Sequence, residues 1–234
     1  MLDKPLQAAT VIITRDTTYD YLEVLMLKRH PNNSFAPSVF VFPGGAMDDV
    51  DKDLGAEYSE ESYQSKEQYV IPGISKPDES ISFWVTAIRE TFEETGLLFA
   101  TKNEDTNEYL NLHEQNNYTL IKEYRNQINQ NTISFNSFLE KEQLRPALEK
   151  LKYFSHWVTP PFFPKRYDTR FFIAKAPNAQ SAEYHEKEHT EQIWISPQEA
   201  INLHYNDEFP LVVPTLMTLK ELTQFSSVSE ALLN

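Results

Sequence analysis

Apolar residues along the chain occur mainly in short runs, and each run ends at a polar or proline-containing break. Runs rich in Val, Ile, Leu and aromatic residues are typical of buried strands. They predict strands at residues 8–14, 21–29, 39–42, 153–158, 169–174 and 192–195. Helices and strands do not alternate regularly between these runs. The pattern therefore predicts an α/β fold in which helices cover the faces of a mixed sheet.

Helical spacing replaces these short runs from residue 81 onward. Five apolar side chains then fall on one side of a helix, namely Ile81, Trp84, Val85, Ile88 and Phe92. Gly96 fits the position just after the helix, where a left-handed backbone is common. Ser196 and Pro197 predict the start of another helix, and residues 214–225 predict a closing one.

Two segments differ in composition from the rest and are predicted to be insertions. The segment at about 46–80 is acidic with scattered tyrosines, and we expect some helix near 56–69. The segment at about 101–150 is rich in Asn and Gln, with apolar residues at helical spacing, which indicates helices or, alternatively, disorder. A length of 234 residues suits a single domain, 1–234, that carries both insertions.

Charge and composition narrow the classes of function. The chain has 21 basic and 35 acidic residues, a net charge of −14, which disfavours nucleic acid as a partner. The absence of cysteine excludes disulfides, cysteine nucleophiles and cysteine-based zinc sites. No apolar run approaches the ~18–20 residues that span a bilayer, and the first residues lack a signal-peptide pattern. We therefore expect a soluble, cytoplasmic protein without a membrane partner.

Three glutamates near the end of the helix that leads to Gly96 are the strongest sign of chemistry. Glu90, Glu93 and Glu94 are predicted to lie opposite the buried face, at spacings where like charges repel and where the helix dipole disfavours anions. A hard cation such as Mg²⁺ or Mn²⁺ would compensate for both penalties. Arg89 could orient one of the carboxylates. The alternative interpretation is an ordinary solvated acidic face.

The residues from Arg89 to Leu97, together with Pro43-Gly44-Gly45, resemble the Nudix hydrolase family. The family signature is G-x5-E-x7-R-E-U-x-E-E-x-G-U, where U is apolar, and Thr91 departs from it mildly. Arg89 follows Gly45 by 44 residues instead of 14, which implies an insertion of 30 residues inside the motif. Counting back from Arg89 puts Ile81 where the first glutamate is expected. The split motif is similar to that of the acyl-coenzyme A diphosphatase branch, as are the segments 157–172 and 191–200.

This resemblance implies a Nudix-type α/β/α sandwich and a metal-dependent diphosphatase. Glu90, Glu93 and Glu94 would bind Mg²⁺ or Mn²⁺, and Glu90 or a carboxylate from a later loop would help to deprotonate the attacking water. Coenzyme A or acyl-coenzyme A is the leading substrate, cleaved to adenosine 3′,5′-bisphosphate and a phosphopantetheine product. Alternatives are ADP-ribose, dinucleotides or dinucleoside polyphosphates as substrates. A non-catalytic nucleotide sensor is a further alternative, to which Ile81 lends weight.

A charged loop at 181–191 is the second candidate region. From it Glu188 is predicted as a fourth metal-site carboxylate, because many members of the family supply one there. Two alternatives are a zinc site on His185 and His189, and a mobile surface loop.

Substrate contacts are expected at Gly44 and Gly45 and at three arginines whose guanidinium groups suit phosphate, namely Arg29, Arg166 and Arg170. Phe35, Phe162 and Phe163 are expected to pack in the core or to stack on an adenine. The expected partner is a small nucleotide-type substrate, and a homodimer is compatible with the sequence.

Overall fold

The computed structural model describes residues 4–18, 21–33, 35–62, 69–102, 109–112 and 114–233. The strands in these ranges form one seven-stranded sheet and one small two-stranded sheet. The large sheet contains β1 (Leu6–Asp16), β2 (Leu22–Arg29), β3 (Phe40–Val41), β4 (Gly44–Ala46), β7 (Leu151–Val158), β8 (Tyr167–Lys175) and β9 (His189–Ile195). The small sheet pairs β5 (Ala100–Thr101) with β6 (Arg145–Pro146), which is followed by a 3₁₀ turn, η3 (Leu148–Lys150).

Strand β1 lies at the centre of the large sheet and pairs in parallel with β8, from Leu6 opposite Tyr167 to Thr14 opposite Lys175. The other strand pairs of this sheet are antiparallel. The sheet is therefore mixed, as predicted. Consecutive side chains of β1 point to opposite faces, and Val11, Ile12 and Ile13 are all fully buried, so both faces of the sheet are covered.

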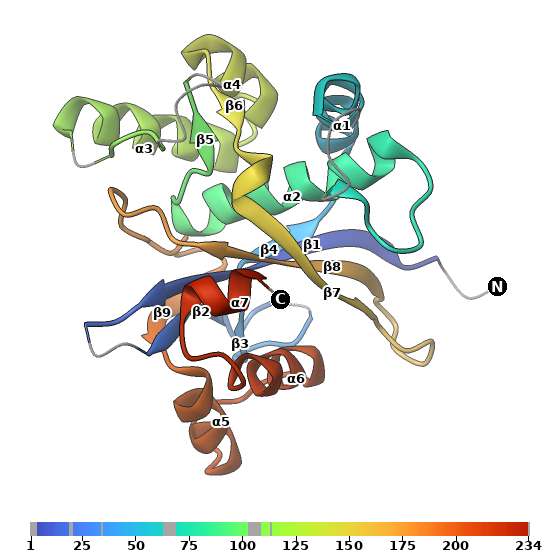
Figure 1. The fold of residues 1–234 in the computed structure, drawn as a ribbon, viewed down its shortest axis with the longest axis vertical. Helices are drawn as coiled ribbons and strands as arrows, with labels where there is room; N and C mark the ends of the chain where they lie inside the picture. Colours follow the sequence, from blue (N-terminus) through green and yellow to red (C-terminus); the bar gives the residue numbers. More distant parts are fainter. Residues whose placement is uncertain are drawn as a thin grey trace.

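Two layers of helices cover the sheet (Figure 1). One layer contains α1 (Asp49–Ser62), α2 (Pro77–Thr95), α3 (Gln115–Asn129) and α4 (Phe135–Glu142). The other contains α5 (Pro197–Tyr205), α6 (Val213–Leu222) and α7 (Val228–Leu233). Each layer packs its own hydrophobic cluster against the sheet, with Phe92 and Phe172 in the first and Phe171 and Leu219 in the second. The α/β fold with a mixed sheet is confirmed.

Helix α2 is the central helix of the first layer. It begins at Pro77, four residues before the predicted start, because proline is favoured in the first helical turn. It ends as predicted at Gly96, whose φ is +73° and whose N–H donates to the Phe92 carbonyl at 2.9 Å. The sheet and the neighbouring helices α1, α3 and α4 cover α2 on almost every side. This covering has a direct consequence for the glutamates described below.

The two insertions contain helices, at positions that differ partly from those predicted. Helix α1 occupies 49–62, earlier than the expected 56–69, and residues 63–68 of that prediction lie outside the described residues. Helices α3 and α4 confirm helical structure in the second insertion, whereas 103–108 and 113 lie outside the described residues. The extent of the single domain, 1–234, stays a prediction.

The C-terminal helices follow the expected signals closely at their start and less closely at their end. The Ser196 side chain accepts a hydrogen bond from the Glu199 N–H at 3.2 Å, so the predicted helix cap is confirmed. The predicted closing helix at 214–225 is α6, which ends at Leu222, and α7 follows it without having been predicted. The closing segment is therefore two short helices instead of one.

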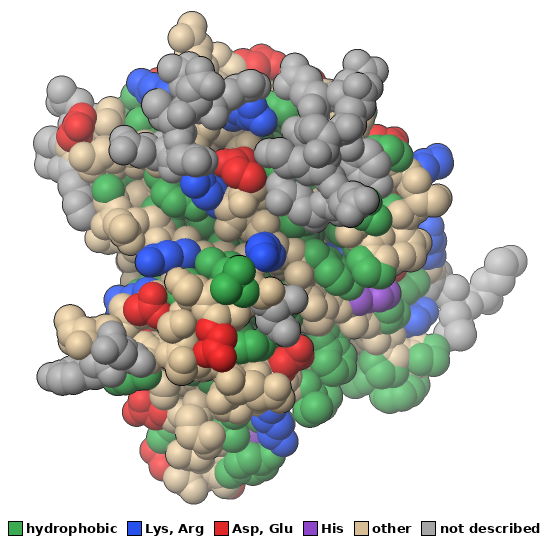
Figure 2. Space-filling model, in the orientation of Figure 1, with side chains coloured by type: hydrophobic (Ala, Val, Ile, Leu, Met, Phe, Trp, Pro, Cys, Tyr) green, Lys and Arg blue, Asp and Glu red, His purple; other side chains and the backbone are tan. Residues whose placement is uncertain are grey.

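The surface does not carry its negative charge as one continuous patch on the face drawn in Figure 2, where coloured Lys and Arg side chains are interspersed with Asp and Glu. Hydrophobic side chains gather where Figure 1 places the β7–β8 hairpin. Phe162, in this hairpin, is 80% exposed, so the expectation that it packs in the core is wrong. None of the helices within the described residues combines the length and the apolar character needed to cross a membrane.

Candidate metal and catalytic site

The three glutamates of α2 lie close to β4, and they are buried. Glu94 is only 5% exposed, and the side chains of Glu90 and Glu93 are mostly covered. The alternative interpretation of an ordinary solvated acidic face is wrong, because β4 and the 181–191 loop cover the side of α2 that faces away from its hydrophobic core. Burying carboxylates is costly unless they are paired or bind a cation, so this correction strengthens the case for a functional cluster.

The two glycines of β4 allow this close approach. The Gly44 N–H donates a hydrogen bond to Glu94 Oε2 at 2.9 Å. A Cβ atom on residue 45 would lie 2.5 Å from the Glu90 carboxylate, which is closer than real contacts permit. Gly45 is therefore required because the backbone touches an acidic side chain. The structure brings Gly44 and Gly45 together with Glu90 and Glu94, and the predicted contact of the two glycines with substrate stays a prediction.

Arg89 connects three elements around the glutamates. Its Nη1 lies 2.9 Å from Glu90 Oε1 and 3.2 Å from Glu93 Oε1, and its Nη2 donates to the Ala46 carbonyl in β4 at 2.9 Å. Burial of Arg89 lowers its pKa, but hydrogen bonds to Asp51 and the charge of Glu90 raise it more, so the net shift is upward. Arg89 thus stays charged and holds two of the three carboxylates in place.

Asp51 is a site residue that the sequence interpretation missed. Arg89 donates to both of its oxygens, from Nε to Oδ1 at 2.8 Å and from Nη2 to Oδ2 at 2.8 Å. Thr86 also donates to Asp51 Oδ2, at 2.9 Å, and Asp51 is fully buried. These contacts make a bidentate pair at the base of the cluster.

Asp51 also occupies the acidic position of the motif. Counted forward from Gly45, the sixth residue is position 51, where the signature has its first glutamate. The assignment of this position to Ile81 is wrong, because the 30-residue insertion follows Asp51 and Ile81 is buried in the hydrophobic core. Counting from the glycine instead of from the arginine would have found Asp51.

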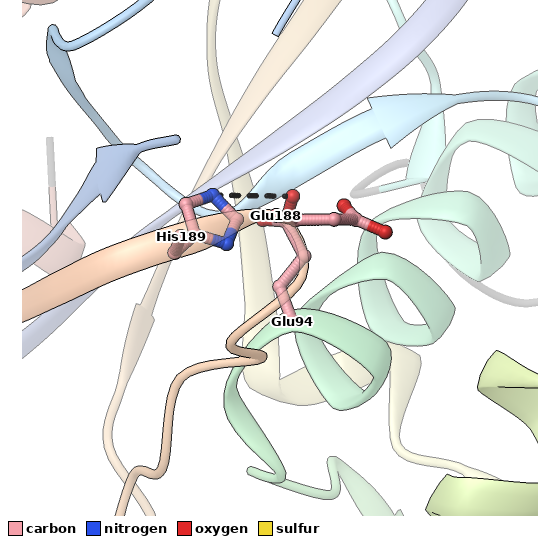
Figure 3. Close-up of side chains that lie close together, drawn as sticks. All are labelled: Glu94, Glu188 and His189. Carbon is pink, nitrogen blue, oxygen red and sulfur yellow. Dashed lines mark ion pairs between the residues drawn. The ribbon is translucent and has the colours of Figure 1, made fainter. Parts of the chain in front are cut away.

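A second group of ligating side chains meets Glu94 from the start of β9. Glu94, Glu188 and His189 each offer one ligand atom, and these atoms all lie within 4.8 Å of one another. Figure 3 shows Glu94 extending from α2 toward the ring of His189, with Glu188 beside them. The distance from His189 Nε2 to Glu94 Oε1 is 3.6 Å. The structure therefore brings Glu188 close to Glu94, and its role as a metal ligand stays a prediction.

Burial shifts the pKa values of the three α2 glutamates and of His189 away from their usual values. Burial raises the pKa of Glu90 to about 8, against the opposing charge of Arg89. Burial also raises the pKa of Glu93, and raises that of Glu94 well above its usual range. Burial, together with the charge of Arg29, lowers the pKa of His189 to about 3, so its ring is neutral. A divalent ion would favour all four groups in their ligating forms.

Comparison with known proteins identifies the family of this site. A family model described as "NUDT19 Nudix domain" matches residues 73–222. The chain belongs to the Nudix hydrolases, in the NUDT19 branch. The match contains α2, the 181–191 loop and β9, but it begins after Asp51.

Individual relatives agree with this family. The acyl-coenzyme A diphosphatase NUDT19 of Xenopus laevis is 27% identical over 244 residues, covering 92% of this chain and 63% of the relative. The acyl-coenzyme A diphosphatase NUDT19 of Gallus gallus is also 27% identical, over 90% of this chain and 63% of the relative. The crystal structure of a NUDIX hydrolase from Alicyclobacillus acidocaldarius has a TM-score of 0.78 and 26% identity, covering 100% of this chain and 98% of that one. The chain thus spans less than two thirds of the curated relatives.

Other acids in the 181–191 loop of this Nudix chain have partners elsewhere. Glu183 accepts from Tyr118 at 2.5 Å and pairs with Lys122 at 2.9 Å, and Glu191 lies 3.5 Å from Lys28. The alternative of a zinc site on paired histidines is not supported. The described residues place His189, but not His185, in the ligand cluster with Glu94 and Glu188.

The three predicted phosphate-binding arginines have different surroundings in the Nudix fold. Arg29 ends β2 directly opposite His189, and its Nε is buried without a hydrogen-bond partner among the described residues. Arg166 donates from Nε to the Thr159 carbonyl at 3.0 Å in the β7–β8 hairpin. Arg170 is 6% exposed, pairs with Asp168 and lies over the Phe83 ring. Of these three arginines, Arg29 borders the group of Glu94, Glu188 and His189, whereas the surroundings of Arg170 favour a packing role.

Proposed function

We propose that this chain hydrolyses the diphosphate bond of coenzyme A or acyl-coenzyme A. The products would be adenosine 3′,5′-bisphosphate and a phosphopantetheine or acyl-phosphopantetheine fragment. The observation that carries the proposal is the buried cluster of Glu90, Glu93 and Glu94 on the Nudix helix, joined by Glu188. The substrate is supported by the relatives named acyl-coenzyme A diphosphatase, of which the chain covers 63% of the length.

The donor set fits a hard divalent cation. Glu90, Glu93, Glu94 and Glu188 offer carboxylate oxygens, which suit Mg²⁺ or Mn²⁺. Among the described residues Arg89 is the cation in direct contact with two of them, and Asp51 already balances its charge. The cluster therefore has a surplus of negative charge. When bound, the ion would offset the charge of the diphosphate and lower the pKa of a water ligand.

The chain's own residues would position the reactants. We assign to Glu90 the role of accepting a proton from the attacking water, with Arg89 at 2.9 Å to hold its carboxylate in place. The backbone of Gly44 and Gly45 would lie beside the substrate, since these residues already contact the carboxylates. Arg29, whose Nε has no hydrogen-bond partner among the described residues, would contact a phosphate oxygen with its guanidinium group. For phosphoryl transfer, such positioning supplies most of the rate.

A hydrolysis screen with mass detection of both product halves tests this function. Coenzyme A, acetyl-coenzyme A and a long-chain acyl-coenzyme A would be compared with ADP-ribose, a dinucleotide and a dinucleoside polyphosphate, each with Mg²⁺ or Mn²⁺. We expect equal amounts of adenosine 3′,5′-bisphosphate and the pantetheine fragment, and no turnover in EDTA. Faster cleavage of ADP-ribose or of a dinucleotide than of coenzyme A would overturn the proposed substrate but not the proposed chemistry. Binding without any cleavage would support the sensor alternative.

The sensor alternative has lost its specific support. It depended on Ile81 at the first acidic position of the motif, and Asp51 occupies that position with two hydrogen bonds to Arg89. With Asp51, Glu90, Glu93 and Glu94 present, every acidic position of the signature carries a carboxylate. A hydrolase is therefore the function that the site supports best.

A further inference from the structure

We propose that His189 supplies a nitrogen ligand to the cation held by Glu94 and Glu188, so that this site favours first-row transition-metal ions over Mg²⁺. The inference rests on the proposed metal-dependent function and adds a property that carboxylates alone would not confer. Imidazole nitrogen suits ions such as Co²⁺ and Ni²⁺, whereas Mg²⁺ prefers oxygen ligands.

Geometry is the first argument for this assignment. Ligand atoms of His189, Glu94 and Glu188 lie within 4.8 Å of one another, and Nε2 of His189 is 3.6 Å from Glu94 Oε1 (Figure 3). Two ligands bound to one ion at ~2.1 Å are separated by about 3.0 Å at right angles and about 4.2 Å when opposite. The Nε2–Oε1 separation falls between these limits and is too long for a hydrogen bond.

The burial of His189 is the second argument. The residue is 1% exposed, and neither Nδ1 nor Nε2 has a hydrogen-bond partner among the described residues. An unsatisfied buried polar group costs about 1–3 kcal/mol, and such groups are rare in native proteins. A metal ion bound at Nε2 would satisfy one of the two nitrogens. The Glu188 side chain is 57% exposed, so the group is open to solvent on that side.

The turn that presents Glu188 and His189 is held by hydrogen bonds at two points before His189, which helps to fix the geometry of a ligand. The Glu188 carbonyl accepts from the His30 N–H at 2.8 Å and from Asn33 Nδ2 at 3.1 Å. The His185 N–H donates to the Glu94 carbonyl at 2.9 Å. The turn is thereby attached both to the segment that follows β2 and to the end of α2, and His189 itself begins β9 opposite Arg29.

Electron spin echo spectroscopy of the Mn²⁺-loaded full chain tests the proposal directly. We expect nuclear modulation from a directly bound histidine nitrogen, identified by ¹⁵N labelling of histidine. The signal should disappear in His189→Gln and persist in His185→Gln, a matched substitution in the same loop. A wild-type spectrum without histidine modulation would overturn the proposal by itself, so this outcome does not depend on the folding of a variant.

Metal affinity measured by calorimetry provides a second readout. Loss of a ligating group should weaken Co²⁺ binding by roughly tenfold or more in His189→Gln, while Mg²⁺ binding should change much less. Bound Mn²⁺ with coenzyme A cleavage, but without histidine modulation, would overturn this inference and leave the proposed function intact. Equal losses of Co²⁺ and Mg²⁺ affinity would also overturn it. Failure to bind any divalent ion would instead overturn the proposed function.

Discussion

The two faces of the central sheet differ in what they bury. The face covered by α1–α4 contains the buried charged or ionisable side chains of the described residues, namely Asp51, Arg89, Glu94, Arg125, Arg170 and His189. On the face covered by α5–α7, the buried polar side chains that the structure describes are uncharged threonines, namely Thr14 of β1 and Thr215 and Thr218 of α6. The same sheet thus supports a purely packed layer on one side and an electrostatically demanding layer on the other.

This difference separates stability from chemistry. Buried charges lower stability unless each has a partner, whereas apolar packing raises stability without any such condition. Apolar packing in the α5–α7 layer can therefore offset the stability that buried charges in the α1–α4 layer cost. Substitutions on the two faces should have different signatures, and these can be ordered by the size of their expected effect.

The largest effect is expected from the carboxylates of α2. Glu93→Gln or Glu94→Gln should reduce turnover of coenzyme A by about 10³-fold, since the loss of a metal ligand forfeits roughly 4 kcal/mol of transition-state stabilisation. The fold should persist, because a glutamine at 94 can still accept the hydrogen bond from the Gly44 N–H. Steady-state kinetics with a thermal unfolding curve measures both. Glu221→Gln, on the exposed side of α6, is the matched control, and normal turnover by Glu94→Gln would refute its role.

The next effect is on stability and involves the buried pair below the site. Asp51→Asn replaces one acceptor of Arg89 by a donor and removes the bidentate partner of a buried charge, which should cost about 3–5 kcal/mol of unfolding free energy. Urea denaturation measures this loss. Asp48→Asn is the control, since Asp48 is exposed and 3.8 Å from Arg89, and it should change stability little. Equal effects of the two substitutions would show that the bidentate pair contributes nothing special.

A packing substitution on the opposite face of the sheet should lower stability and leave turnover unchanged, the reverse of the glutamate substitutions in α2. Leu219 in α6 is fully buried, and Leu219→Ala should cost about 2–5 kcal/mol by leaving a cavity. Turnover per folded molecule should stay at the wild-type level, because α6 packs on the face of the sheet opposite α2 and its carboxylates. Denaturation and kinetics on the same preparation test this, and a large fall in turnover would mean that the two faces are coupled.

The smallest effect is the pH dependence of the metal-free protein. Burial raises the pKa of Glu90 to about 8, so the folded state keeps a proton that the unfolded state has already released. Stability should therefore fall as pH rises toward 8, by up to ~1.4 kcal/mol per pH unit for one proton. The lowered pKa of His189 acts with the opposite sign, but only below its ordinary value of 6.5.

Melting curves between pH 6.5 and 8, with and without Mg²⁺, test this pH dependence, and the Glu90→Gln variant shows how much of it comes from Glu90. The melting temperature in EDTA should decrease across this range, and the increase caused by Mg²⁺ should grow. Glu90→Gln should make the decrease in EDTA smaller, while the raised pKa values of Glu93 and Glu94 remain. A wild-type protein whose stability in EDTA rose over this range would contradict the raised pKa of Glu90.

Much of the site was predictable because helical spacing is a local property. The positions of Glu90, Glu93 and Glu94 relative to one another, and the end of the helix at Gly96, follow from 3.6 residues per turn. Their burial did not follow, because an amphipathic pattern says nothing about what covers the polar side of a helix. Asp51 was in principle readable from its distance to Gly45, but the insertion hid it from a count made backward from Arg89.

The sequence by itself determined the mixed α/β class, the acidic motif on one helix and the membership of a metal-using family, since each depends on residues close together in the chain. Only the tertiary structure decided that Asp51 pairs with Arg89, that β4 and the 181–191 loop bury the carboxylates, and that His189 faces Glu94. The physical reason is that these contacts join residues 38 to 95 positions apart, and their geometry depends on strand register and helix packing.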